Sequence, residues 1–586
     1  MPTFPSTGSS VPSAHREKRV FFLFWGISIL WLGLGMHFFM HNPGGAGLYL
    51  PFNAWGWIFA SLMVCLGLWH ITSKGELVSS RLLQVWGGAI VLMLLPMAWS
   101  DTTLRDYALP RLGGLVGGGL FLFSLYQFRL APKARQQLLT LMLVAIAIEM
   151  TLGLVQYYLL TPGNWLGYDT KANRPYGIFQ QPNVMASFMA TGLSLAAWLN
   201  TLNQHRWLKV LQGYVIVGSV VLLIVLQSRV GQLGGILALL MMLSWLKRNH
   251  ALKVTLSCVL LGVLFGLASL YGVEGVKRGL SVYQSGGYRT IYWSYALHLL
   301  SQHPFTGWGY GSFESVFLHN YMADKLLNPA MPQIEYNLDH PHNELLYWAV
   351  EGGILPVIGL LVMGAAVIWR VAGQSWSHGL ALLALAVPIT LHTQVEYPLY
   401  HSIAHWIFLL MLVWYIDETC AADAARGIVV YRYPHKLLLR FLAVSIPLFI
   451  VPFMLTALHT AWVVTKYERG GYKEPSLLLD IINPMAWLTR VEFDVNAVRL
   501  MVGLQTQNKT ELEAYLAWGQ DFVRHTPRAN IYENMVVALN ALGRPDEARN
   551  LRAEALRWYP KEPLLIEATS KPMVSGVDTL PTGAAN

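Results

Sequence analysis

Charged residues are scarce in this chain. Asp, Glu, Lys and Arg make up 12% of its 586 residues, whereas hydrophobic residues make up 54% and the mean hydropathy is +0.42. A soluble globular protein normally carries about twice that share of charge. The composition therefore excludes an ordinary soluble enzyme and predicts an all-α polytopic membrane protein.

Cysteine is also rare, with three residues in the whole chain. Cys65 and Cys258 fall in apolar runs, and Cys420 falls in a predicted cytoplasmic loop. None of them is therefore placed to form a disulfide outside the membrane, where oxidising conditions would permit one. We expect the exported parts to be stable without this cross-link.

Nucleotide and metal motifs are missing as well. The glycine-rich stretch Gly307–Gly311 lacks the lysine of a P-loop and its strand–turn–helix setting. No Asp-x-Asp pair or His-Glu-x-x-His cluster is present to hold a divalent metal, so we expect no cofactor. The net charge of +9 is explained by membrane topology and gives little reason to expect nucleic acid as a partner.

Runs of about twenty apolar residues recur from Val20 to Val464. This is the length that a helix needs to cross the roughly 30 Å of hydrocarbon in a bilayer. The runs predict about thirteen transmembrane helices in a domain that covers residues 19–465. The predicted spans are 19–41, 54–71, 83–99, 111–128, 137–160, 184–200, 208–226, 230–246, 252–273, 344–369, 377–393, 403–416 and 437–465.

The distribution of basic residues predicts the orientation. Residues 1–18 include a basic cluster, and no signal-peptide cleavage site follows it at the expected distance, so we expect a cytoplasmic tail and a retained first span. Lys and Arg are then concentrated in alternate loops, which is the bias of cytoplasmic loops. With an odd number of spans, this bias places loop 417–436 in the cytoplasm and residues 274–343 and 466–586 in the periplasm.

The region 466–570 has the composition of a soluble helical domain. Helical patterns run through 485–505, 511–525, 529–542 and 545–558. Gly543 and Pro545 separate the last two patterns in the way that a glycine stop and a proline start do, which is typical of one tetratricopeptide-type hairpin. Plain helical packing is an equally good interpretation. Residues 571–586 have the composition of a disordered tail.

Two histidines and a carboxylate stand where the large external loop meets the next span, in His340-Pro341-His342-Asn343-Glu344. The pKa of imidazole lies near neutrality, so this position suits proton transfer on a substrate delivered by the membrane. Polar loops also contain histidine for no catalytic reason, and the prediction therefore rests on position.

The partner of His342 is left open by the sequence. Glu351 lies nine residues further on, about 180° around a regular helix, so the two can pair only if Gly352-Gly353 breaks that helix. The next external turn offers four candidates instead. They are Glu396, Tyr397, Tyr400 and His401. Tyrosines of an interfacial aromatic belt are the alternative interpretation of this turn.

Two arginines interrupt the pattern of basic residues, because Arg229 and Arg289 fall on the predicted outer side. Guanidinium groups match phosphate oxygens with two parallel donors, and the pair therefore suggests a phosphate site. Each arginine alone is more typical of contacts with lipid headgroups. The loop before the sixth span adds the amides of Gln180, Gln181 and Asn183, which suit sugar hydroxyls or are ordinary helix-entry residues.

Together these motifs resemble those of the bacterial membrane glycan ligases, the superfamily of O-antigen ligases and O-antigen polymerases. The loop that contains Gln180 and Gln181, called the glutamine loop below, and the C-terminal helical region are more similar to those of the protein O-oligosaccharyltransferases. These enzymes glycosylate pilins and other exported proteins. The motifs that carry the resemblance are Phe179-Gln180-Gln181-Pro182-Asn183, Ser228-Arg229-x-Gly231, Arg289 with Pro304–Gly311, and His340–Glu344 followed by Glu351-Gly352-Gly353.

The resemblance implies an enzyme of the bacterial inner membrane with its active site on the periplasmic face. It implies transfer of a preassembled oligosaccharide from an undecaprenyl-pyrophosphate carrier to Ser or Thr hydroxyls of a periplasmic protein such as a pilin. His342 would be the catalytic base, and Arg229 and Arg289 would bind the pyrophosphate of the donor.

The remaining site residues follow from the same resemblance. Gln180 or Gln181 and Tyr397 or Tyr400 would hold the donor sugar or the acceptor. We expect His342 to be essential and His340 to point into the loop, because His342 matches the histidine–asparagine pair of the family. The full supporting set is Gln180, Gln181, Asn183, His340, Asn343, Glu344, Tyr397 and Tyr400.

Two other functions remain possible on this evidence. The first is the same chemistry with a lipid A-core or a growing glycan as acceptor, which is the activity of an O-antigen ligase or polymerase. The second is a lipid or glycan transporter. A transporter would normally show ionisable residues near the bilayer midplane and internal repeats, and we find neither in the sequence.

Overall fold

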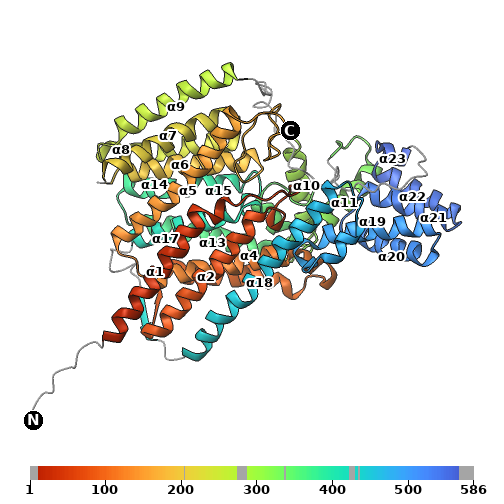
Figure 1. The fold of residues 1–586 in the computed structure, drawn as a ribbon, viewed down its shortest axis with the longest axis horizontal. Helices are drawn as coiled ribbons and strands as arrows, with labels where there is room; N and C mark the ends of the chain where they lie inside the picture. Colours follow the sequence, from red (N-terminus) through yellow and green to blue (C-terminus); the bar gives the residue numbers. More distant parts are fainter. Residues whose placement is uncertain are drawn as a thin grey trace, which may run out of the picture.

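The computed structural model describes residues 11–202, 205–273, 287–334, 338–420, 429–432 and 436–566. Long helices form one bundle, and shorter helices near the C-terminus gather at one end of it (Figure 1). The long helices are α1 (Val11–Gly33), α2 (Pro51–Lys74), α3 (Arg81–Leu94), α4 (Thr102–Gln127), α5 (Pro132–Tyr158), α6 (Pro182–Asn200), α7 (Arg206–Val225), α8 (Arg229–Arg248), α9 (Leu252–Gly272), α13 (Ile354–Val371), α17 (Ile403–Cys420) and α18 (Lys436–Arg469).

The prediction of an all-α polytopic membrane protein is confirmed. Within the described ranges, eleven helices are long and apolar enough to cross a membrane. This is two fewer than the thirteen or so predicted spans, because α6 is not among the eleven and because the predicted span 377–393 is broken into helices too short to count. The predicted span 344–369 is also broken, but its longer part, α13, is among the eleven. Residues 344–369 form α12 (Glu344–Gly352) and α13, and residues 377–393 form α14 (Trp376–Ala384) and α15 (Val387–His392).

Helix α6 lies in the centre of the bundle. It contacts α5, α7, α8 and α15, and its side chains from Val184 to Asn200 are buried. Hydroxyl groups of Ser187, Thr191 and Ser194 are buried with it. They bond back to carbonyl oxygens three or four residues earlier, so each is satisfied inside the helix. The helix is therefore covered by protein rather than by lipid, and it need not be as apolar as a lipid-facing span.

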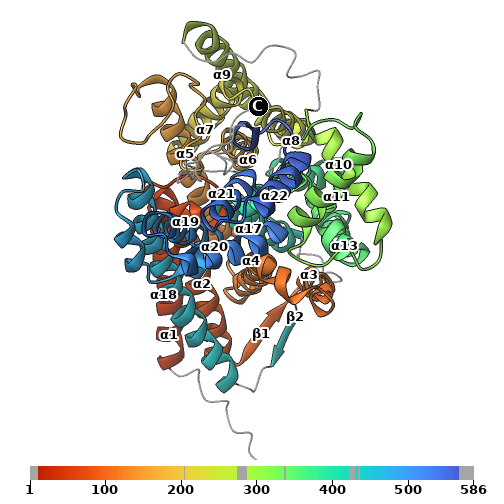
Figure 2. The ribbon, with the colours of Figure 1, turned by 90° about the vertical axis from the view of Figure 1, so that its right-hand side faces the viewer.

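A small antiparallel sheet joins two loops that were both predicted to be cytoplasmic. Strand β1 (Glu76–Ser79) follows α2, and strand β2 (Val429–Arg432) precedes α18. Their register pairs Glu76 with Arg432 and Ser79 with Val429. The sheet lies at the same end of the molecule as the start of α1 (Figure 2). The two loops therefore share one side of the bundle, as the charge pattern predicts.

The opposite end carries the large loop and the C-terminal helices (Figures 1 and 2). Helix α10 (Arg289–Gln302) and helix α11 (Phe313–Leu327) are the helices of the described part of the loop. The C-terminal helices are α19 (Leu488–Thr506), α20 (Lys509–His525), α21 (Ala529–Ala541), α22 (Pro545–Trp558) and α23 (Pro563–Ile566). The first four begin and end within three residues of the predicted patterns. The predicted disordered tail, 571–586, lies outside the described residues.

The C-terminal helices pack directly on the large loop. Arg528 forms an ion pair with Glu314 of α11, and Ser315 donates a hydrogen bond to the carbonyl oxygen of Arg524. The ring of Trp558 also packs edge-on against His319, with the ring centres 5.2 Å apart. These contacts tie the C-terminal helices to the helix pair that carries Arg289.

The glycine-rich stretch Gly307–Gly311 has a structural role at the break between α12 and α13. Backbone N–H groups of Trp308 and Gly309 donate to the carbonyl oxygens of Val350 and Glu351 at 2.9 and 2.8 Å. The Glu351 carboxylate accepts from the N–H of Phe313 at 3.0 Å and pairs with Arg111 of α4, and both charges are buried. The loop therefore supplies hydrogen-bond donors to the free backbone carbonyl groups and to the buried carboxylate at the point where the span is interrupted.

The break itself depends on Gly353. Its φ of 69° and ψ of −151° lie in a region that only glycine adopts readily, and a Cβ there would collide with the carbonyl oxygen of Phe305. We expect Gly353→Ala to lower the apparent melting temperature of the detergent-solubilised protein, through strain of about 1–3 kcal/mol. Gly364→Ala, within the α13 helix that follows Gly353, is the control, because a Cβ there meets no atom within 4 Å. Equal melting temperatures for the two variants would contradict this account.

Candidate active site

His342 lies in the short connection that precedes α12. Its φ of 53° is in the left-handed region, which is unusual for a residue other than glycine, asparagine or aspartate. Its Nδ1 is 2.9 Å from Oε2 of Glu396, in the turn after α15. If the ring is neutral, Nδ1–H donates to the carboxylate and Nε2 keeps a lone pair that can accept a proton.

The Glu396 carboxylate is shared between His342 and an arginine. Nη2 of Arg289, the first residue of α10, forms an ion pair with Oε1 of Glu396, and its Nε donates to the carbonyl oxygen of Val395 at 3.0 Å. Burial alone would raise the pKa of Glu396, but the hydrogen bond from His342 and the charge of Arg289 lower it to about 2. The carboxylate is therefore charged at neutral pH.

His340 does not point into the loop, so that expectation was wrong. Its side chain is buried, with 4% of its surface exposed, and its Nδ1 accepts the backbone N–H of His342 at 2.8 Å. This bond helps to hold His342 in its left-handed conformation. Burial lowers the pKa of His340 well below its usual value, with His342 adding to the effect, so the ring is neutral. A neutral ring is what its role as a hydrogen-bond acceptor requires.

Asn343 and Glu344 fix the start of α12. The Asn343 side chain caps the helix by accepting from the N–H of Leu346 at 3.0 Å, and its Nδ2 donates to the carbonyl oxygen of Gln394 at 3.1 Å. The buried Glu344 carboxylate accepts from Nε1 of Trp348 at 2.7 Å and from the hydroxyl of Tyr400. These bonds hold the His342 connection and the Glu396 turn together.

The loop before α6 that contains Gln180 and Gln181, the glutamine loop, is held in place by side chains of α5. Oε1 of Gln156 accepts the N–H groups of Tyr176 and Gly177 at 2.9 and 2.8 Å, and the buried Glu149 accepts the N–H of Ile178 at 3.0 Å. The adjacent Gln180 has a φ of 57°, so the chain turns sharply just before α6. Two polar side chains of a long helix therefore set the position of the loop.

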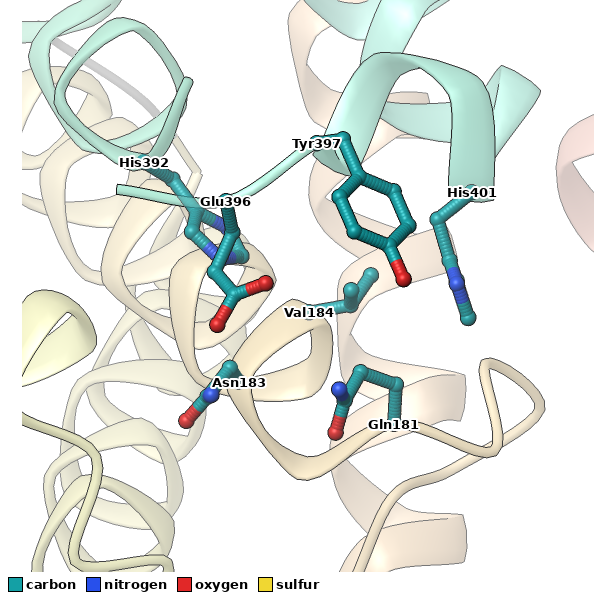
Figure 3. A pocket seen from close by; sticks show the side chains of 7 residues that line it. All are labelled: Gln181, Asn183, Val184, His392, Glu396, Tyr397 and His401. Atoms are coloured by element: carbon teal, nitrogen blue, oxygen red, sulfur yellow. The ribbon is translucent and has the colours of Figure 1, made fainter. Parts of the chain in front are cut away.

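A pocket joins the glutamine loop to the Glu396 turn. It is lined by Gln181, Asn183, Val184, His392, Glu396, Tyr397 and His401. The Glu396 carboxylate and the Tyr397 hydroxyl project from the turn towards the side chains of Asn183 and Gln181 (Figure 3). The pocket thus presents amides, a charged carboxylate and a phenol in one place.

The predicted residues take different places around this pocket. Gln181, Asn183 and Tyr397 line it, whereas Gln180 is not among the lining residues. Arg229 begins α8, and the preceding Ser228 donates to Oδ1 of Asn183 at 2.9 Å, which brings the start of α8 to the edge of the pocket. His340 and Glu344 are buried next to His342, and the partly buried Tyr400 contacts both of them, through its ring with His340 and through its hydroxyl with Glu344.

The sequence did not identify several residues that support the site. Nδ1 of His392 lies 2.7 Å from the hydroxyl of Ser187 in α6, and this histidine lines the pocket. Trp293 donates to the carbonyl oxygen of Pro341 at 3.0 Å, and the ring of Tyr292 stacks against His342 with centres 6.2 Å apart. Tyr292 and Trp293 could have been found from their spacing, because they follow Arg289 by three and four positions and so share its face of α10. No comparable pattern in the sequence indicated His392.

The geometry suits removal of a proton from a hydroxyl next to an anionic group. A positioned imidazole with a carboxylate behind it is the arrangement of a general base. Arg289 brings a cation to the other oxygen of the same carboxylate, and positioned cations stabilise charge that develops on a leaving phosphate. The arrangement supports attack by a hydroxyl on a phosphate-activated substrate.

Comparison with known protein families gives three matches. Residues 214–361 match the family described as O-antigen ligase, and residues 380–571 match the C-terminal region of the virulence factor membrane-bound polymerases. Residues 175–199, which contain the glutamine loop and most of α6, match the protein glycosylation ligases. No curated protein sequence matches the chain.

The lowered pKa of Glu396 predicts how stability depends on pH. A carboxyl group with a pKa of about 2 in the folded protein, against the usual 4.5, stabilises the fold above pH 4.5. This contribution is lost as the pH falls towards 2. Between these values, the apparent melting temperature of the detergent-solubilised wild type should fall more steeply than that of Glu396→Gln. Glu554→Gln, at an exposed position on α22, should follow the wild type, and parallel curves for all three proteins would refute the prediction.

Proposed function

Because the chain belongs to the O-antigen ligase superfamily, we propose that it is a protein O-oligosaccharyltransferase. Its donor would be an oligosaccharide linked to undecaprenyl pyrophosphate, and its acceptor a Ser or Thr hydroxyl of a periplasmic protein such as a pilin. The observation that carries the proposal is the shared carboxylate of Glu396, which joins His342 to Arg289 beside the glutamine loop. We place the enzyme in the bacterial inner membrane with this site on the periplasmic face.

In the proposed reaction, Nε2 of His342 takes the proton of the acceptor hydroxyl. The hydroxyl oxygen attacks the anomeric carbon of the first sugar, and the bond from that carbon to the pyrophosphate oxygen breaks. The electron pair of the broken bond stays on the lipid pyrophosphate. The charge on Glu396 favours the imidazolium that forms, because the carboxylate is already hydrogen-bonded to Nδ1.

Arg289 stabilises the leaving pyrophosphate in this scheme. A guanidinium has five N–H donors, and two nitrogens of Arg289 are engaged with Val395 and Glu396. The remaining donors are available to phosphate oxygens. Arg229 supplies the second cation from the start of α8, beside Asn183. Gln181, Asn183 and Tyr397 hold the sugar or the acceptor, since amides and phenols pair with hydroxyl groups without trapping them by charge.

Two observations favour a protein acceptor. The match to protein glycosylation ligases falls on the loop that lines the pocket. The C-terminal helices also dock on α11 through Arg528 and Glu314, next to the helix that carries Arg289, and so extend the surface around the site. The matches to O-antigen ligases and membrane-bound polymerases favour a second candidate, with lipid A-core or a growing glycan as the acceptor.

The proposal is tested with purified protein and a defined lipid-linked oligosaccharide. Two acceptors are compared in separate reactions, a pilin-type protein with a Ser/Thr-rich segment and a lipid A-core. We expect the glycan on the protein and none on the lipid, as measured by mass spectrometry. Transfer to lipid A-core alone would establish the second candidate instead.

The same assay tests the proposed base. Replacing His342 by alanine should lower turnover by at least about 10²-fold without preventing donor binding, because a positioned base typically contributes 10²- to 10⁴-fold. His340→Ala is the comparison variant. It removes the acceptor for the His342 N–H but leaves the base, so a measurable fraction of activity should remain. Unchanged turnover in His342→Ala refutes the assignment, and loss of donor binding makes His342 a pyrophosphate ligand.

Lysine substitutions test the two arginines. Arg289→Lys keeps the positive charge, but its single ammonium group cannot reproduce the planar fork that reaches Val395, Glu396 and a phosphate together. We expect a higher KM for the donor or a lower kcat in Arg289→Lys and in Arg229→Lys. Arg549→Lys, on the exposed face of α22, should behave as the wild type. Wild-type kinetics in both site variants, at equal protein levels, would assign these arginines to packing or topology.

A further inference from the structure

The connection between α18 and α19 exposes several large apolar side chains. Residues 475–488 form two short 3-10 helices, η6 (Pro475–Asp480) and η7 (Pro484–Trp487), and contain a single charged residue, Asp480. Leu479, Ile482 and Met485 are 87%, 64% and 73% exposed. They recur at every third position, so three large apolar groups face away from the protein within one short segment.

The depth of this segment in the membrane can be judged against α18, which has a tryptophan next to a basic residue near each of its ends. Near one end, the Arg440 guanidinium lies 5.6 Å from the ring of Trp69, and near the other, the Lys466 ammonium lies 5.6 Å from the ring of Trp462. Tryptophan and basic residues mark the two interfaces of a bilayer. At 1.5 Å per residue, Arg440 and Trp462 are roughly 33 Å apart along the axis, close to the thickness of the hydrocarbon layer.

The segment folds back along α18 to a level inside the Trp462 boundary. Nδ2 of Asn483 donates to the carbonyl oxygen of Phe453 and to the hydroxyl of Thr456, both at 3.1 Å. Thr460 donates to the carbonyl oxygen of Asn483 at 2.9 Å. These contacts place Asn483 beside residues 453–460 of α18, which lie on the Trp462 side of the midpoint between Arg440 and Trp462 and come within roughly 3 Å of Trp462 along the axis.

The inner face of the segment is held by protein. Trp487 is buried, and its Nε1 donates to the carbonyl oxygen of Leu48 at 3.1 Å, just before α2 begins. Leu478 is also buried. The segment therefore has a protein face and an apolar outer face, and it lies at the periphery of the bundle beside α18 (Figure 2). Exposed Leu448 and Phe449 of α18 belong to the membrane-facing surface of the same helix.

We infer that residues 475–488 form an interfacial anchor, with Leu479, Ile482 and Met485 inserted among the acyl chains near the headgroups of one leaflet. The occupant of this surface is the bilayer that α18 itself crosses, because the exposed face continues the membrane-facing surface of α18. The anchor leads directly into α19, so it holds the C-terminal helices at the membrane on the side of α10 and α11. The inference goes beyond the proposed transfer reaction and does not depend on it.

Site-directed spin labels test the anchor in full-length protein reconstituted in lipid nanodiscs. Single cysteines replace Leu479, Ile482 or Met485 in a protein whose three native cysteines are alanine. Collision rates of the label with oxygen, which concentrates in hydrocarbon, are compared with those of a water-soluble nickel complex. We expect high oxygen and low nickel collision rates at all three positions.

Two reference positions calibrate the measurement. Leu264→Cys reports lipid, because Leu264 is 58% exposed on the membrane-spanning α9, and Asp546→Cys reports water, because its side chain is 83% exposed on α22. Nickel collision rates like those of Asp546→Cys would overturn the inference. Low rates with both reagents would also overturn it, since they would show the face covered by an acceptor protein or a second copy of this chain.

A second measurement uses the protein without substitutions. Trypsin cleaves after Lys473 and Arg490, so the whole segment lies in one peptide, 474–490. Reconstitution with a phospholipid that carries a photoactivatable group on its acyl chain should give lipid-modified peptide 474–490. Absence of this adduct, when peptides from α9 are modified, would contradict the anchor even if the cysteine variants fail to fold.

Discussion

The carboxylate of Glu396 holds the site together, because it bonds two groups that arrive from distant parts of the chain. His342 comes from the end of the large loop and Arg289 from its beginning, more than fifty residues earlier. A carboxylate buried without partners would take up a proton, whereas these two partners keep it charged. The charge therefore fixes the tautomer of His342 and the position of Arg289 at the same time.

Two of the predicted membrane helices are interrupted near this carboxylate. The break at Gly353 separates α12 from α13, and a second break separates α14 from α15. Irregular backbone at such positions is stable only where protein covers it, since lipid offers no hydrogen bonds. The stretch Gly307–Gly311 and the buried pair of Arg111 with Glu351 provide that cover. The backbone groups left unpaired by the break between α12 and α13 thus find hydrogen-bond partners in the protein, close to the candidate site.

The sequence identified much of the candidate site, and its errors have a common cause. It selected His342, Arg289 and the glutamine loop, and it named Glu396 among four possible partners. It misplaced His340, because the direction of a side chain in a loop depends on its tertiary partner, here the N–H of His342. It could not pair Arg111 with Glu351, which are 240 residues apart, since no spacing rule connects separate helices.

The sequence by itself determined the membrane class, the positions of most long helices, the bounds of α19 to α22 and the external placement expected for the site motifs. These features follow from hydropathy, from the distribution of basic residues between loops and from the residues that start and stop helices. Each of these patterns can be recognised within about twenty residues or fewer. Tertiary structure decided which helices are broken, which side chains meet at Glu396 and which face of residues 475–488 is exposed. Those outcomes depend on contacts between segments far apart in the chain, and local patterns carry no information about such contacts.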